Sequence, residues 1–283
     1  MSTTPSTARP GARLRLVALL GPPMLWLVVA YLGSMAVLLL SAFWSTNAFT
    51  GAVVPVYTSG NLLSLVTDPL YRAVTLRTIL VALGVTVVDI VVAVPVALTM
   101  SRIASPRLRI ALVVAVTTPL WASYLVKAYA WRVLLAPTGP IAWLTGGHTT
   151  GYGIAAVVIT LSYLWLPYMV LPVFAGFDRV PESLLEASAD LGAPIVTTLR
   201  RVVAPLVLPA VAAGSIFTFS LSLGDYIAVT IVGGKTQMLG NVIYGQLVTA
   251  NNQPLAAALS IVPLVAIVLY LLLMRRTGAL ENV

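Results

Sequence analysis

Long apolar stretches dominate this chain and limit what it can fold into. Six of them follow one another between Leu16 and Arg275, separated by more polar segments of different lengths. A helix that crosses a membrane needs about 20 mostly apolar residues, and inside lipid it must satisfy its own backbone hydrogen bonds. Only 8% of the residues are charged and 59% are hydrophobic, whereas soluble domains carry roughly 25% charged residues. The sequence therefore predicts an all-α integral membrane protein with six transmembrane helices.

The apolar stretches also predict the domain organisation. The expected spans lie near residues 16–43, 77–101, 109–135, 152–176, 204–232 and 255–274. They form a single transmembrane domain over 16–276, after a polar, basic tail at 1–15 that is predicted to be disordered. Residues 277–283 form a second short tail. The first apolar run is too long for a signal-peptide core, so we expect it to remain as a span. The sequence assigns no structure to segment 44–76.

The basic residues indicate the orientation. The chain has 16 Lys and Arg against 8 Asp and Glu, a net charge of +8, but the basic residues are not gathered into one patch, which argues against nucleic-acid binding. If the N-terminus lies inside, three basic residues before the first span and eight in later inner segments are cytoplasmic, which makes 11 of the 16. Lys and Arg are enriched on the cytoplasmic side of membrane proteins. Both termini are therefore predicted to be cytoplasmic.

The third predicted span and several prolines give further expectations. Aromatic residues follow this span and its outer end, as in an interfacial belt: Trp121, Tyr124, Tyr129, Trp131 and Trp143. Prolines inside the spans remove backbone donors: Pro22, Pro23, Pro95, Pro119, Pro167 and Pro172. Such breaks need partners in neighbouring helices or a wet cavity. They favour a packed bundle around a pathway over a purely structural scaffold.

Residues for catalysis or metal binding are scarce. The chain has no cysteine, which excludes disulfides and thiolate sites, and its one histidine, His148, has no carboxylate nearby in the sequence. The GGKT at Gly233 to Thr236 is not a phosphate-binding loop, because that motif needs glycine where Val229 stands. No catalytic triad or HExxH motif is present. We therefore expect no enzyme activity and no cofactor or metal in this chain.

The longest inner segment, Pro181 to Ala210, has the pattern of a short amphipathic helix. Apolar residues recur at helical spacing: Leu184, Leu191, Ile195, Leu199 and Val202. Acidic residues recur four apart on another face: Glu182, Glu186 and Asp190. Like charges at this spacing destabilise a helix slightly, so helix stability alone does not explain them. From the residues alone, docking of a partner and a solvated amphipathic helix are equally supported.

The ends of this helix can also be predicted. Ser183 and Glu186 have the spacing of a capping box, which places a helix start there. Gly192 is expected to end the helix in a left-handed turn, and Pro194 suits the first turn of a second helix. The segment is therefore predicted to be helix, tight turn and helix, outside the membrane.

The same segment carries a family resemblance. Seven positions match the EAA signature of permease subunits in binding-protein-dependent ATP-binding-cassette importers: Glu186, Ala187, Ser188, Leu191, Gly192, Ala193 and Pro209. Ser188 stands where the signature has a second alanine. The stretches Pro119–Leu144 and Ser222–Leu247 resemble the spermidine/putrescine permease subfamily. The resemblance covers essentially residues 12–276.

The resemblance implies a function and partners. In that family this loop, here 177–203, forms a coupling helix that docks on a cytoplasmic ATPase. The candidate coupling residues of this chain, from the signature and the acidic face together, are Glu182, Glu186, Ala187, Asp190, Leu191, Gly192 and Ala193. The implied partners are an ATPase dimer that binds ATP and Mg, a second six-helix permease as a heterodimer, an extracytoplasmic substrate-binding protein and the lipid of the bacterial inner membrane. Polyamines are the leading substrate. A phosphonate or ferric iron importer of the same family, or an ion-coupled secondary carrier, remain alternatives.

Two carboxylates inside the predicted spans are candidates for the substrate pathway. Asp89 lies near the middle of the second span and Asp225 in the outer half of the fifth, where a lone charge is costly. Aromatic residues could join them in a cation path: Tyr226, Trp165 and Tyr168. The alternative is structural, an interhelical pair with Lys127 or Arg132, or hydrogen bonds to Ser and Thr.

Overall fold

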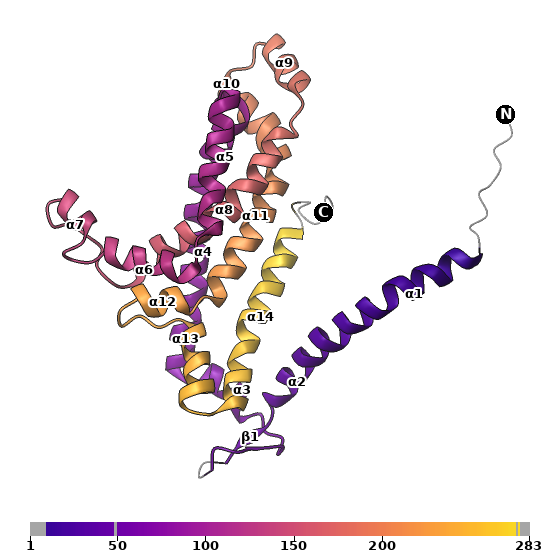
Figure 1. Cartoon of the computed structure of the whole chain (residues 1–283), viewed down its shortest axis with the longest axis vertical. Coiled ribbons are helices and arrows are strands. Elements are labelled where there is room, and N and C mark those ends of the chain that lie inside the picture. The colour runs from indigo at the N-terminus through magenta and orange to yellow at the C-terminus, as the bar shows by residue number, and fades with distance from the viewer. Residues whose placement is uncertain (1–9, 48–49, 276, 278–283) are drawn as a thin grey trace.

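Helices make up most of the computed structural model, which describes residues 10–47, 50–275 and 277. The longer helices are α1 (Pro10–Leu27), α2 (Ser34–Ser41), α3 (Gly60–Thr67), α4 (Pro69–Leu98), α5 (Pro106–Trp121), α6 (Tyr124–Leu134), α8 (Ile154–Asp178), α9 (Glu182–Asp190), α11 (Ala204–Gly224) and α14 (Gln253–Arg275). The shorter ones are α7 (Pro140–Leu144), α10 (Ile195–Thr198), α12 (Ile227–Val232) and α13 (Leu239–Tyr244). Four π-helical stretches adjoin them: η1 (Val28–Gly33), η2 (Thr99–Ile103), η3 (Leu199–Val203) and η4 (Gly245–Thr249). Figure 1 shows their arrangement.

The predicted fold class is confirmed. Within the described residues, five continuous helical stretches are long and apolar enough to cross a membrane: Ala18–Ser41, Pro69–Ile103, Ile154–Asp178, Ile195–Gly224 and Gln253–Arg275. The bent pair α5 and α6 supplies the sixth span when it is counted as one. Helix α1 already begins at Pro10, within the segment predicted as a disordered tail, while residues 1–9 and 278–283 of the tails lie outside the described residues.

The third span is not the single helix predicted over 109–135. It breaks at Ala122 and Ser123, which are both extended, with ψ of 143° and 135°. The axes of α5 and α6 differ in direction by 101°. Extended residues cannot continue the helical hydrogen-bond ladder, so α6 turns sideways. This turn carries Tyr124 toward the Gly224 end of α11. "Inner" and "outer" ends are named here after the orientation that the sequence predicts.

Two other expected boundaries are also corrected. The fifth span was predicted over 204–232, but its helix starts at Ile195, runs through η3 into α11 and ends at Gly224. The second span starts at Pro69, eight residues before the predicted boundary, because Asp68 caps it by accepting a hydrogen bond from the backbone N–H of Leu70 at 2.8 Å. The unassigned segment 44–76 forms a short hairpin, β1 (Ser45–Thr46) with β2 (Val53–Val54), then α3 and the start of α4.

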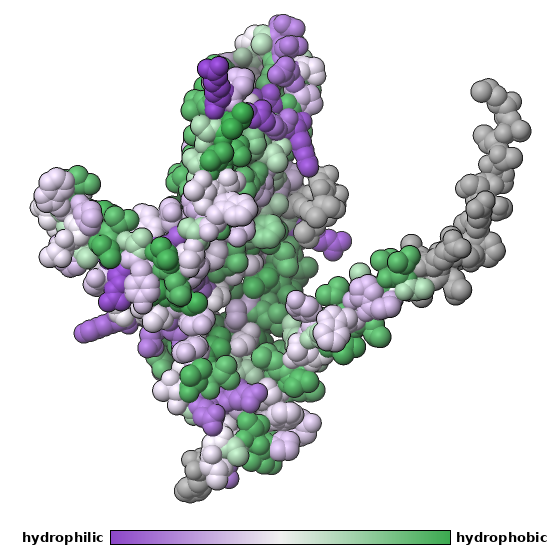
Figure 2. Space-filling model, in the orientation of Figure 1, coloured by the Kyte–Doolittle hydropathy of each residue, from purple (hydrophilic) through white to green (hydrophobic). Residues whose placement is uncertain are grey.

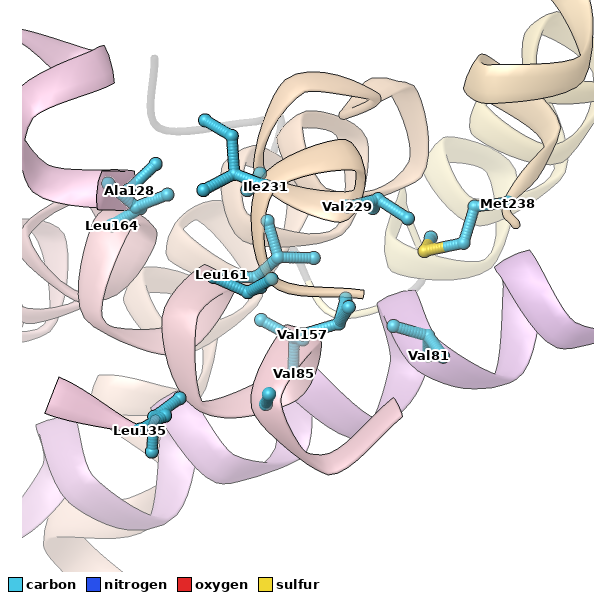
Figure 3. Packing of buried hydrophobic residues seen from close by; sticks show 13 residues of the cluster. Val81, Val85, Ala128, Leu135, Val157, Leu161, Leu164, Val229, Ile231 and Met238 are labelled. Atoms are coloured by element: carbon cyan, nitrogen blue, oxygen red, sulfur yellow. The ribbon is translucent and has the colours of Figure 1, made fainter. Parts of the chain in front are cut away.

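Helices α4, α8 and α11 pack together as the centre of the bundle. Figure 3 shows Val157 and Leu161 of α8 packed between α4 and α12 in a buried hydrophobic cluster. The contact of α8 with α11 is very close, since a Cβ at Gly214 would lie 2.8 Å from Sδ of Met169. Small residues allow this approach in membrane helices. The close packing fixes α8, from which the inner loop emerges, against α11, into which that loop returns.

The outer surface is that of a membrane protein. Figure 2 shows hydrophobic side chains along the body of the bundle and hydrophilic ones gathered at the end that carries α9. Helix α1 leans away from the other helices (Figure 1), and almost all of its described side chains are exposed. Only 6% of the most apolar 18 residues of the first span are buried, so this span makes few contacts within the described part of the chain. Its apolar surface must therefore face lipid or another protein.

Candidate functional site

Helix α9 forms the tip of the inner loop, as predicted, but it begins differently. Pro181 is the N-terminal flanking residue and Glu182 the first helical residue, so Ser183 lies inside the first turn. The predicted capping box between Ser183 and Glu186 is wrong, since no side chain caps this end. Pro181 has φ of −62°, which suits the entry to a helix without such a bond. Glu186 is thereby free of a capping role and exposed to solvent.

The end of α9 agrees with the prediction. Gly192 has φ of +70°, in the left-handed region that favours glycine. Its N–H donates to the carbonyl of Ala189 at 2.8 Å, and the N–H of Ala193 donates to the carbonyl of Ser188 at 3.1 Å. These two bonds form a Schellman motif, which satisfies carbonyls that the helix end would leave free. Gly192 therefore sets the direction in which the chain leaves α9.

The predicted second helix exists but is not separate. Pro194 precedes α10, and α10 runs through η3 into α11, so the fifth span itself begins directly after the turn. Ser188, buried in α9, shares a hydrogen bond of 2.8 Å with the hydroxyl of Thr198 in α10. This bond ties α9 to the start of the fifth span, and alanine at position 188 could not make it.

The candidate residues for ATPase coupling lie together at this tip. Six of them are exposed: Glu182, Glu186, Ala187, Asp190, Leu191 and Gly192. Leu191 is 87% exposed, and Ile195 and Val196, which follow the turn, are 79% and 74% exposed. Ala193 is half-buried and lines, with Glu182 and Glu186, a groove of about 530 Å³ between α9 and the inner ends of α4 and α8. The tip thus presents apolar and acidic side chains beside a groove.

Asp225 occupies the break at the outer end of α11. This helix ends at Gly224, and Asp225 is extended, with ψ of 119°. Its Oδ1 accepts a hydrogen bond from the backbone N–H of Ala228 at 2.9 Å, at the start of α12. Its Oδ2 accepts a hydrogen bond from the hydroxyl of Tyr124 on α6. The pairing with Lys127 or Arg132 that the sequence left open is not formed: Arg132 lies over the ring of Tyr152, 5.7 Å from its centroid.

The Asp225 carboxylate borders a cavity of about 340 Å³. The residues that line it come from α6, α8, α11 and the start of α12: Tyr124, Trp165, Ser220, Leu221, Gly224, Asp225, Tyr226 and Ile227. The rings of Tyr124 and Trp165 lie 6.0 Å apart between centroids. Tyr226 also borders an outer cavity of about 480 Å³ and stacks on Tyr244 at 5.0 Å. The break therefore brings one carboxylate into an aromatic cavity.

The other predicted pathway residues are placed differently. Tyr168 contacts Trp165, with centroids 6.0 Å apart, but does not line the Asp225 cavity. Asp89 is fully enclosed between helices, with the Ser162 side chain beside it. Neither of its oxygens has a hydrogen bond of normal geometry within the described part of the chain. Asp89 and Asp225 thus do not meet in one cavity.

Sequence reasoning missed two features of this site. Tyr124 was interpreted only as an interfacial anchor, whereas it bonds Asp225. Arg102, Arg109 and Asp178 lie together at the inner ends of α4, α5 and α8, whereas the sequence had used the two arginines only for the orientation. No spacing in the sequence relates these residues, since 101 positions separate Tyr124 from Asp225. For metal binding, residues 10–47, 50–275 and 277 contain no group of three His, Asp or Glu side chains placed as ligands.

Comparisons with known proteins agree with this architecture. The chain is 40% identical over 286 residues to the inner membrane ABC transporter permease protein YdcU of Escherichia coli (strain K12), covering 95% of this chain and 91% of that protein. It is 31% identical over 224 residues to the spermidine/putrescine transport system permease protein PotB of Escherichia coli (strain K12), covering 76% and 81%.

Solved structures show the same fold. A chain of a bacterial ABC transporter that imports the acidic polysaccharide alginate aligns with a TM-score of 0.68 at 16% identity, over 94% of this chain and 96% of that one. A chain of the MetNI methionine ABC transporter, in inward-facing form, aligns with a TM-score of 0.61 at 17% identity, over 74% and 96%. The family model described as "Binding-protein-dependent transport system inner membrane component" matches residues 60–277. The chain belongs to this family and is a permease subunit of an ABC importer.

Proposed function

We propose that this permease subunit passes a polyamine across the membrane and that Asp225 contacts an ammonium group of the substrate. One observation carries the proposal: the only carboxylate of the Asp225 cavity stands among the rings of Tyr124, Trp165 and Tyr226. Aromatic faces and a carboxylate together attract alkylammonium groups, through cation–π and ionic interactions. The name of the relative PotB, a spermidine/putrescine permease, supports the same substrate class.

The cavities also fit a chain-like cation. Tyr226 and Ile227 line both the Asp225 cavity and the outer cavity of about 480 Å³. The outer cavity is lined by Tyr129, Tyr244, Gln237 and Asn241, whose side chains carry hydroxyl and amide groups. These groups accept hydrogen bonds from ammonium groups without adding charge. A polyamine could therefore place one ammonium at Asp225 while another stays in the outer cavity.

The subunit is proposed to work in a larger assembly. The exposed acidic and apolar tip of α9 supports docking on an ATPase dimer that binds ATP and Mg. The mostly exposed first span and the exposed apolar side chains of α5 and α6 support packing against a second six-helix permease. Substrate would come from an extracytoplasmic binding protein, and both termini would lie in the cytoplasm. Because the chain belongs to the ABC importer permease family, the alternative of an ion-coupled secondary carrier is excluded.

The test is Asp225→Asn in the assembled importer, with uptake of labelled spermidine and putrescine as the readout. Asparagine keeps the shape and can still accept the Ala228 bond, but it loses the charge. A charge-assisted hydrogen bond contributes roughly 1.5–3 kcal/mol, so we expect the apparent affinity for transport to fall by about 10-fold or more. Asp89→Asn removes a carboxylate that does not line this cavity, and it should leave uptake unchanged.

Two results would contradict the proposal. Parental spermidine uptake by an intact Asp225→Asn complex would remove Asp225 from the pathway. Binding-protein-stimulated transport of a phosphonate or of ferric iron, with none of a polyamine, would show that the substrate is another solute of the same family of importers.

A further inference from the structure

The inner end of α8 is held by side chains from the turn between the second and third spans. Arg102, in η2, donates from its Nη2 to the backbone carbonyls of Phe177, at 2.7 Å, and Val180, at 2.5 Å. Phe177 lies in the last turn of α8, and Val180 directly precedes Pro181 and α9. Arg102 therefore satisfies carbonyls at the end of one helix and at the entry to the next.

Asp178 receives two further contacts from the same side. The hydroxyl of Ser101 donates to its Oδ1 at 2.9 Å, and Arg109, in the first turn of α5, pairs with its Oδ2. The guanidinium of Arg109 also lies 4.9 Å from the ring centroid of Phe174 on α8. We call Ser101, Arg102, Arg109 and Asp178 the α8 latch. The latch joins the α4–α5 turn to the last turn of α8.

The two arginines do not contribute equally to holding the inner end of α8. The Arg109–Asp178 pair is 40% and 38% exposed, and ion pairs with that much solvent contribute little to stability. Arg102 bonds carbonyls of Phe177 and Val180, two residues whose side chains are each only 4% exposed, and backbone groups there cannot easily turn to water instead. Arg102 is thus the stronger member, and Arg109 adds a single contact with Asp178 and its position over the ring of Phe174.

The position of the α8 latch, next to the start of α9, means that a displacement of α9 also moves the latch. One residue, Pro181, separates the Val180 carbonyl held by Arg102 from the first residue of α9. On the other side of α9, the Ser188–Thr198 hydrogen bond ties that helix to the start of the fifth span. A displacement of α9 therefore acts directly on two regions, the α4–α5 turn through the latch and α11 through α10.

We propose that the α8 latch transmits displacement of α9 to the second and third spans, and that Arg102 and Arg109 are positioning residues for coupling. The proposal rests on α9 being the coupling element of the proposed function. It adds a route to α4 and α5 besides the covalent route into α11. The break after α5 leads to α6, which carries Tyr124 to Asp225, so this route ends at the proposed substrate cavity.

The experiment uses the complete importer in liposomes and measures substrate transported per ATP hydrolysed. Arg102→Gln and Asp178→Asn should reduce this ratio by about 3-fold or more, the range that single positions in coupling networks reach, while the ATPase stays bound at parental stoichiometry. Arg107→Gln is the matched control, because Arg107 is an exposed arginine of the same segment that makes none of these contacts. Arg102→Lys keeps one donor group and should recover part of the ratio.

A distance measurement separates transmission from simple stabilisation. The chain has no cysteine, so spin labels can be placed at Leu184 on α9 and Leu108 on α5, both exposed. In the parental complex we expect the label distance to stay constant between ATP-free and ATP-bound states, because the latch moves both helices together. In Arg102→Gln the distance should change with ATP.

The outcomes distinguish the latch from the coupling helix. Parental transport per ATP in Arg102→Gln and Asp178→Asn, or a label distance that ATP leaves unchanged in Arg102→Gln, would overturn the latch. Gly192→Val serves as the reference for the coupling element itself. If Gly192→Val uncouples and the latch variants do not, only the latch is wrong. If Gly192→Val also transports normally, the proposed coupling role of α9 is wrong.

Discussion

Substitutions at Gly192 test the effect of backbone strain without any steric clash. Its φ of +70° is a conformation that L-residues rarely adopt, yet a Cβ built at this position meets no atom within 4 Å. A side chain there causes no clash, so the whole effect is backbone strain. A left-handed conformation costs a residue with a Cβ roughly 1–2 kcal/mol, less for asparagine and more for a β-branched residue. The expected order of damage is Val, then Ala, then Asn.

The magnitude follows from the turn that would be lost. A strain of 1–2 kcal/mol lowers the population of the correct turn about 5- to 30-fold relative to alternatives. The Schellman bonds of Gly192 and Ala193 would open in those molecules, and the chain would leave α9 in another direction. Gly192→Val should therefore weaken ATPase association or substrate-stimulated hydrolysis at least 5-fold, whereas Gly192→Asn should stay within about 2-fold of the parent.

The assay is purification of each variant with its partners, followed by ATPase stoichiometry and stimulated turnover. Membrane insertion serves as the control, because the apolar spans are unchanged and all three variants should insert equally. Glu186→Gln tests the docking face separately and should have a milder effect, since Glu186 has no capping role and only its charge is removed. A Gly192→Val complex that assembles and transports at the parental rate would refute the reasoning.

Three further predictions concern orientation and the buried carboxylates. Cysteines placed at the exposed Leu191 and Lys235 should react with an impermeant reagent in intact cells only at Lys235, and labelling confined to Leu191 would reverse the proposed orientation. Tyr124→Phe removes the hydroxyl that donates a hydrogen bond to Asp225 and should lower the free energy of unfolding by about 1–3 kcal/mol. The thermal unfolding temperature should fall by several degrees, and an unchanged temperature would show that this bond contributes nothing to stability. Asp89→Asn should keep or raise that temperature, because an enclosed carboxylate whose oxygens make no hydrogen bond of normal geometry within the described residues costs several kcal/mol when charged. A fall would mean that the charge of Asp89 is used.

Much of the architecture could be predicted from local sequence. The six apolar stretches indicated the spans because burial in lipid requires a long apolar helix whatever its neighbours are. Gly192 was predicted as the end of α9 because only glycine takes its backbone conformation without strain. The capping box failed because Pro181 already fixes the entry to α9. In that case a residue outside the motif decided where the helix began.

Contacts between distant segments decided the rest. Pro119 indicated a weak point in the third span, but not that Ala122 and Ser123 would be extended. They turn α6 so that Tyr124 reaches Asp225. In the same way Arg102 meets the carbonyl of Val180, 78 positions further along the chain. Periodicity and spacing report only the face of one helix, and one sequence holds no record of which faces meet. The sequence by itself determined the spans, their composition and the tip of the inner loop; the tertiary structure alone decided which charges are paired, which is enclosed and which borders a cavity.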